Sequence, residues 1–168
     1  MSKDVASQDA SNKDALSKHT SGKTAPERAA FYFDRAQGFN CAESVLLGVA
    51  GKAGNLVPRI ATGFGAGFGR RGVVCGAVSG GTMAIGLKFG RDDGQTPDAA
   101  AAKERCYQLT LEFCRRFEEE FGSCFCRDLT GCDLTTPEGR QKADELDVHN
   151  TSCMGYVKRA AEILEEML

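Results

Sequence analysis

A chain of 168 residues fits one domain of ordinary size, and such a domain buries enough apolar surface to fold without disulfide bonds. Lysine and arginine number 21 against 23 acidic residues, so there is no strong positive field of the kind that attracts nucleic acid. The chain has eight cysteines and only two histidines. A site built mainly from imidazole is therefore nearly excluded, and cysteine side chains are the candidates for a reactive or metal-binding site.

The first 25 residues hold almost no large apolar side chain, so burial cannot offset the entropy of ordering them, and we expect a disordered tail. They lack the apolar run of a secretory signal, and no stretch of about 18 apolar residues could span a membrane. We therefore expect a cytoplasmic protein whose thiols stay reduced and serve metal binding or catalysis. A single cysteine-rich domain is expected over residues 26–168.

Two helices are predicted at the start of this domain. Pro26, at an early helical position, begins the first helix, which ends at Gly38. Asn40 stands three residues before Glu43, a capping-box spacing that predicts a second helix ending at Gly51.

Glycine shapes the middle of the chain. Residues 58–70 alternate glycine with Phe and Ala, which favours a tight loop or close backbone packing over a regular helix. The apolar run 73–87 is also rich in small residues and predicts a buried helix against which another backbone packs closely. Residues 98–121 have the strongest helix pattern, with apolar side chains along one stripe.

After a cysteine-rich link, Thr136 and Pro137 predict a short helix to about Leu146, and a last helix runs from near Cys153 to Leu168. No alternating strand pattern appears. The predicted fold class is therefore all-α, a compact bundle of five to seven helices with a disordered N-terminal tail. Its glycine-rich packing surfaces are compatible with a homodimer.

Several cysteines stand at predicted helix N-termini. Cys41 and Cys153, and less clearly Cys75, lie where free N–H groups and the helix dipole stabilise a thiolate. We therefore expect lowered pKa values for these thiols. Cys106 and Cys114, inside the long predicted helix, are interpreted as small buried apolar side chains.

The link contains three sulfurs in nine residues, those of Cys124, Cys126 and Cys132. Such a segment can deliver several thiolates to one point, as zinc or an iron–sulfur cluster requires. The spacing matches neither a zinc ribbon nor a ferredoxin, so any such centre must be assembled from distant segments.

Two other patterns in the sequence point to different chemistry. Residues 67–72 read Gly-x-Gly-x-x-Gly, but a dinucleotide site needs a preceding strand, which the sequence does not show. His149, close to Cys153, would suit a nitrogen ligand or a base for the thiol, although we favour an ordinary polar loop at this point.

Four segments carry a resemblance to a known family. They are residues 39–46 (FNCAESVL), 63–67 (GFGAG), 74–80 (VCGAVSG) and 126–131 (CRDLTG). Together they resemble the C_GCAxxG_C_C family, which is described as redox-active, from about residue 27 to the end of the chain. The family label writes Gly-Cys-Ala where this chain reads Cys75-Gly76-Ala77.

The resemblance implies which residues form the site. The family's four cysteines fall on Cys41, Cys75, Cys126 and Cys153, and the neighbours implied to bind a cofactor are Gly76, Ala77 and Gly80. Similar domains accompany electron-transfer cytochromes, which implies an iron–sulfur or iron centre. Cys124 and Cys132 are additional to the family's four, so the working sulfur of the link stays open.

Three hypotheses result. In the first, the four cysteines converge and bind an iron–sulfur cluster or a metal ion, iron or zinc, for redox sensing or for electron transfer with a redox partner protein. In the second, Cys41 or Cys153 is the low-pKa nucleophile of a thiol–disulfide oxidoreductase. In the third, the chain is a non-catalytic helical interaction module whose cysteines only fill space. Whether the protein is an enzyme stays open between them.

Overall fold

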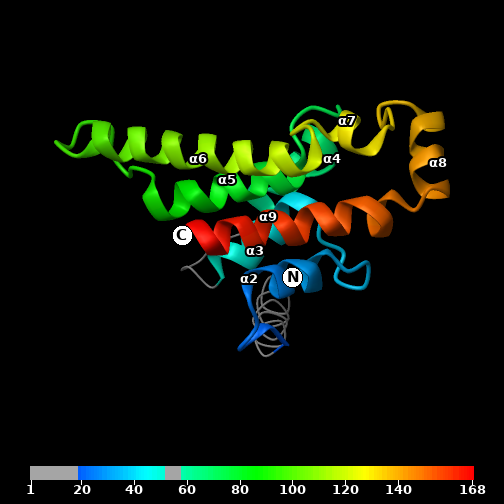
Figure 1. The fold of residues 1–168 in the computed structure, drawn as a ribbon, viewed down its shortest axis with the longest axis horizontal. Coiled ribbons are helices and arrows are strands. Elements are labelled where there is room, and N and C mark those ends of the chain that lie inside the picture. The colour runs from blue at the N-terminus through cyan, green and yellow to red at the C-terminus, as the bar shows by residue number, and fades with distance from the viewer. Residues whose placement is uncertain (1–18, 52–57) are drawn as a thin grey trace, which may run out of the picture.

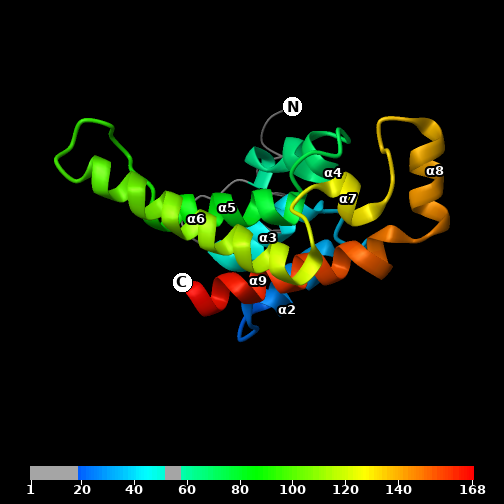
Figure 2. The same ribbon diagram turned by 45° about the horizontal axis from the view of Figure 1, so that its top comes forward.

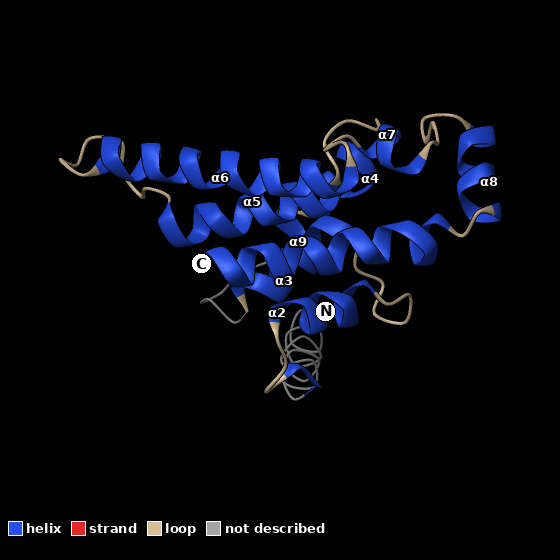
Figure 3. Ribbon diagram, in the orientation of Figure 1, coloured by secondary structure: helices blue, strands red, loops and turns tan. Residues whose placement is uncertain are grey.

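A computed structural model of the chain describes residues 19–51 and 58–168, and within them the protein is all-α. This part of the chain contains helices and one isolated β-bridge, between Val74 and Phe125, but no strand (Figure 3). The predicted fold class is confirmed. The expected disordered tail falls mostly on residues 1–18, which lie outside the described residues.

The α-helices are α2 (Ala25–Phe33), α3 (Cys41–Ala50), α4 (Gly65–Phe68), α5 (Gly76–Phe89), α6 (Ala99–Phe121), α7 (Cys126–Thr130), α8 (Pro137–Glu145) and α9 (Met154–Met167). Two 3₁₀ turns, η1 (Pro58–Ile60) and η2 (Thr62–Phe64), precede α4, and a π-helical segment, η3 (His149–Cys153), precedes α9. Eight α-helices in the described residues exceed the five to seven expected, because the short α4 and α7 form inside segments predicted as loop and link.

Capping side chains set the helix starts that the sequence predicts. The Asn40 side chain accepts hydrogen bonds from the backbone N–H groups of Ala42 (2.9 Å) and Glu43 (3.1 Å), and Glu43 accepts one from the Asn40 N–H (2.8 Å). The hydroxyl of Thr136 accepts a hydrogen bond from the Gly139 N–H at 2.9 Å, which begins α8. Each such cap stabilises its helix by about 1 kcal/mol.

The bundle is built around α3, α5 and α9 (Figures 1 and 2). Helix α3 packs against α2, α5 and α9, while α6 lies along α5 and α9. Large apolar side chains of α6 and α9 are fully buried in one cluster: Phe113, Phe117, Ile163 and Leu164. Leu46 of α3 is fully buried in a second cluster, with Ala42, Ala61 and Ala84. Burial of each of these large side chains stabilises the fold by roughly 1.5–3 kcal/mol.

The two ends of the bundle differ. Helix α8 stands apart from the other helices at one end in both views, and it buries no side chain (Figures 1 and 2). At the other end the turn between α5 and α6 projects beyond the core (Figures 1 and 2). No helix in the described part of the chain is long and apolar enough to cross a membrane.

Small residues let α3 approach its neighbours closely. A Cβ atom on Gly48 would lie 2.7 Å from the Cβ of Ala29 in α2, and one on Gly80 would lie 2.3 Å from the carbonyl oxygen of Ala42. The predicted close backbone packing of the glycine-rich helix α5 is therefore present. It brings the N-termini of α3 and α5 side by side.

Candidate functional site

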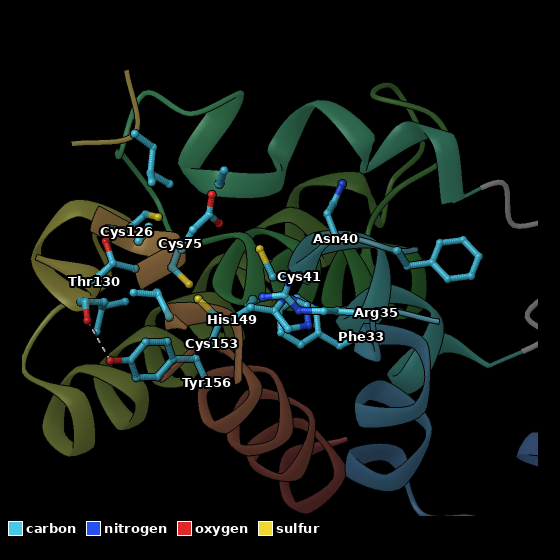
Figure 4. A pocket seen from close by; sticks show the side chains of 18 residues that line it. Phe33, Arg35, Asn40, Cys41, Cys75, Cys126, Thr130, His149, Cys153 and Tyr156 are labelled. Atoms are coloured by element: carbon cyan, nitrogen blue, oxygen red, sulfur yellow. Dashed lines mark hydrogen bonds between the residues drawn. The ribbon is translucent and has the colours of Figure 1, made fainter. Parts of the chain in front are cut away.

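Four cysteines from four separate segments line one cavity. Cys41 begins α3, Cys75 immediately precedes α5, Cys126 begins α7 and Cys153 ends η3. The cavity has a volume of about 260 Å³, and Figure 4 shows the four sulfur atoms directed toward the same space. Its apolar walls include Phe33, Phe39, Ala66, Ala77, Leu129, Val148 and Tyr156.

Backbone pairing brings Cys75 and Cys126 together. The Cys75 N–H donates to the Cys124 carbonyl at 2.8 Å, and the Cys126 N–H donates to the Val73 carbonyl at 2.7 Å. These bonds flank the bridge between Val74 and Phe125. The short ladder joins the segment before α5 to the link after α6, and so places their sulfurs at one cavity.

The sulfur of Cys41 lies where two helix N-termini and a turn meet. The backbone N–H groups of Cys41, Ala42, Ala66 and Gly76 face it and favour the thiolate. Burial of the side chain is the larger effect and raises the pKa of Cys41. The lowered pKa that we predicted from the helix N-terminus is therefore wrong, because the thiol is buried.

The other three thiols show the same balance. Burial raises the pKa of Cys75, that of Cys126 to about 11 and that of Cys153 to about 12. Neighbouring sulfurs add to each shift, because a second thiolate in the cavity would repel the first. As free thiols, all four are neutral near pH 7.

The segment labelled α4 contains a left-handed turn, which supplies one of the N–H groups at Cys41. Residues Ala66, Gly67, Phe68 and Gly69 all have positive φ, between 53° and 67°. This conformation costs roughly 1–2 kcal/mol for each residue that is not glycine. The turn also brings Gly67 so close to α7 that a Cβ there would lie 2.7 Å from the Cβ of Cys126. Strain is thus concentrated beside the cavity.

The chain before Cys153 is helical, which corrects two predictions. We interpreted the segment around His149 as a polar loop, but residues 149–153 form the π-helical segment η3, which runs directly into α9. Asp147, with φ of 45°, begins this segment, and its carbonyl accepts hydrogen bonds from the N–H groups of Asn150 (2.9 Å) and Thr151 (3.0 Å). Cys153 is therefore not at a free helix N-terminus.

His149 also lines the cavity. Its ring stacks on Phe33, with ring centres 4.1 Å apart. Burial, helped by the charge of Arg35, lowers the pKa of His149, so the ring is neutral at pH 7. Its Nε2 atom is buried and has no hydrogen-bond partner within residues 19–51 and 58–168, so it can accept a hydrogen bond from an occupant of the cavity.

The remaining cysteines lie outside the cavity. Cys132 is buried close enough to raise the pKa values of Cys126 and Cys153. Cys124 turns toward Cys114 on α6, with its sulfur 3.9 Å from the Cys114 carbonyl oxygen. All eight cysteines of the chain fall within the described residues, and all are free thiols.

The three small residues expected to bind a cofactor have different surroundings. Ala77 lines the cavity. Gly76 lies against Cys41, since a Cβ there would be 2.1 Å from its sulfur, whereas Gly80 packs on the backbone of α3. The Gly-x-Gly-x-x-Gly segment, residues 67–72, begins in the left-handed turn and has no strand before it in the described chain.

As the side chains stand, no three His, Cys, Asp or Glu residues in the described part of the chain are close enough to hold one metal ion. A tetrahedral zinc ion, with bonds of about 2.3 Å, needs sulfurs roughly 3.8 Å apart. The four sulfurs share a cavity, but no three of them are gathered closely enough for such an ion.

Sequence reasoning missed Ala66, Arg35 and Tyr156 at this site. Ala66 acts through its backbone, and the alternation of glycine around it was the available signal. Arg35 and Tyr156 line the cavity, and the Tyr156 hydroxyl donates a hydrogen bond to the Leu129 carbonyl at 2.9 Å. Nothing in their sequence surroundings distinguishes them.

The described part of the chain is all-α and places four thiols around one cavity. Residues 39–167 match the family described as "Putative redox-active protein (C_GCAxxG_C_C)", and the chain belongs to this family. The resemblance found in the sequence is thereby confirmed. Comparisons with curated proteins and with solved structures found no match.

Proposed function

We propose that Cys41, Cys75, Cys126 and Cys153 hold an iron–sulfur cluster and that the protein exchanges single electrons with a redox partner protein. The observation that carries this proposal is the convergence of four thiols, from four segments, on one cavity. Four thiolates are the usual ligand set of such clusters.

The chemistry of the donor set fits a cationic centre. Burial and mutual repulsion oppose the presence of several thiolates in this cavity, as the raised pKa values show. Positive iron ions reverse that preference, because they bind the deprotonated form. The cluster, when bound, supplies the site that stores and releases the electron.

The surroundings of Cys41 would tune such a centre. Hydrogen bonds from N–H groups to a ligating sulfur withdraw negative charge and raise the reduction potential. The four N–H groups at Cys41, one of them held by the strained turn, have this effect. Cysteines that only filled space would not need them, which disfavours the non-catalytic module.

The donor set suits a cluster. In a [4Fe–4S] cluster each of four thiolates binds a different iron. No group of three ligands in the described chain is already close enough for a single metal ion. The raised pKa values disfavour the thiol–disulfide alternative at these four cysteines, since none is a ready nucleophile at pH 7.

Anaerobic reconstitution tests the proposal. The reduced protein is incubated with ferrous iron and sulfide, desalted, and analysed for iron, sulfide and visible absorption. We expect stoichiometric iron and sulfide with charge-transfer absorption, and each of C41S, C75S, C126S and C153S should lose most of both.

C106S is the matched control, because Cys106 lies on α6 outside the cavity, and it should retain the cluster. A protein that takes up zinc but no iron and sulfide, or that holds a cluster equally well after the four substitutions, would overturn the proposal.

A further inference from the structure

A second group of thiols lies behind the cavity. Cys114 is on α6, and Cys124 follows the end of that helix by three residues. The Cys124 thiol donates a hydrogen bond to the Cys114 carbonyl oxygen at 3.9 Å, which holds the two cysteines next to each other. We propose that Cys114 and Cys124 are a dithiol that reacts with low-molecular-weight disulfides and closes to a reversible intramolecular disulfide.

The two thiols differ in access. Cys124 is buried, with 7% of its surface exposed, whereas Cys114 is partly exposed on α6. Only Cys114 can therefore meet a dissolved disulfide first. Cys124 is held next to it and suits the role of the resolving thiol.

The neighbouring Cys124 also affects the charge state of Cys114. Its side chain lowers the pKa of Cys114, against opposing effects of burial and of Glu118. A lowered pKa increases the thiolate fraction of the attacking residue at neutral pH.

The reaction balances in two steps. The Cys114 thiolate attacks one sulfur of a small disulfide such as oxidised glutathione, which forms a mixed disulfide and releases one glutathione thiolate. Cys124 then loses its proton to solvent, and its sulfur displaces the second glutathione thiolate from Cys114. The protein gains one disulfide, and one molecule of oxidised glutathione becomes two of the thiol.

This pair is distinct from the four-cysteine cavity but connected to it. The Cys124 carbonyl is the acceptor for the Cys75 N–H, and Cys124 is separated from Cys126 by one residue. The disulfide itself does not depend on what the cavity holds.

Mass spectrometry tests the proposal on the full chain. The reduced protein is exposed to increasing oxidised glutathione, quenched, and digested with chymotrypsin, whose cleavage after Phe113 and Phe125 separates Cys114 from Cys106 and Cys124 from Cys126. We expect a linked pair of peptides, 114–117 joined to 122–125, as the first product.

The variant C124S should instead trap Cys114 as a lasting glutathione adduct, and C106S should form the linked pair at the native rate. The proposal is overturned if Cys106 or a cavity cysteine is oxidised before Cys114, or if C124S traps no adduct on Cys114. Because cysteines are assigned by peptide, these results are independent of whether the cavity binds a cluster.

Discussion

At the scale of single residues, the surroundings of Cys41 distinguish this site from an ordinary buried thiol. Its sulfur lies against Gly76 and is faced by backbone N–H groups from α3, from α5 and from the left-handed turn. Each of these contacts is made by backbone atoms. A substitution therefore disturbs them only where it introduces a larger side chain. Gly76 is the position at which such bulk has the greatest effect.

Replacement of Gly76 by alanine tests that contact. The new Cβ would lie 2.1 Å from the Cys41 sulfur and 3.1 Å from the Ala42 nitrogen, so α3 and α5 must separate. We expect a loss of roughly 1–3 kcal/mol in the free energy of unfolding, measured by urea denaturation, together with loss of the reconstituted cluster. Gly86, in the same helix, is the control, since a Cβ there meets nothing within 4 Å. G86A should stabilise the protein by about 0.5–1 kcal/mol. Equal effects of the two substitutions would contradict this account of the site.

The raised thiol pKa values predict how stability depends on pH in the metal-free protein. Above the ordinary thiol pKa the unfolded chain loses protons that the folded chain keeps at Cys126 (pKa about 11) and Cys153 (pKa about 12). The free energy of unfolding should therefore fall as pH rises from about 9 toward 11, by at most about 1.4 kcal/mol per pH unit for each thiol. Urea titrations under reductant measure this slope, and C153S should flatten it. A slope unchanged in C153S would show that this thiol is not shielded from solvent.

At the scale of elements, prediction from sequence succeeded where a local signal exists. Asn40 and Glu43 carry the capping box that begins α3, and the same signal placed Cys41 in its first turn. For the left-handed turn, the alternation of glycine was the only signal in the sequence. Ala66 and Phe68 adopt positive φ there because of the surrounding structure, which the sequence pattern does not reveal. The segment η3 was missed because its polar residues carry no helical periodicity and Asp147, two residues before it, has positive φ. Burial of the cysteines, and hence the direction of their pKa shifts, is a property of packing that no local pattern reveals.

Tyr156 links two of the elements that present cysteines. Its hydroxyl, on α9, donates to the carbonyl of Leu129 in α7, close to both Cys126 and Cys153. Y156F should lower the free energy of unfolding by about 0.5–1.5 kcal/mol and speed hydrogen exchange in α7. Tyr107 on α6 is 57% exposed, so Y107F should change neither quantity. Unaltered exchange in α7 of Y156F would show that the short helix is held by its backbone ladder alone.

At the scale of the whole molecule, the cysteine cavity lies against the apolar core, because Phe33, Cys75 and Ala77 line the cavity and also belong to the main buried cluster. The fully buried side chains of α3, α6 and α9 pack in the bundle, whereas the cavity also draws on the peripheral elements α7 and η3. The bundle therefore has its own source of stability, and the cavity joins to it segments that pack less extensively. A centre bound by four cysteines would tie those segments to the core.

Removal of that centre should therefore loosen one end of the molecule without unfolding it. Because a group that binds only the folded state at 100 times its Kd adds about 2.7 kcal/mol, we expect anaerobic chelation to lower Tm by roughly 5–10 °C. Circular dichroism at 222 nm should change little, since the core helices do not need the cysteines to stay buried. Hydrogen exchange should quicken first in α7 and η3, and C106S should respond to chelation as the native protein does. Complete loss of helical signal on chelation would mean that the cavity, and not the apolar core, holds the bundle together.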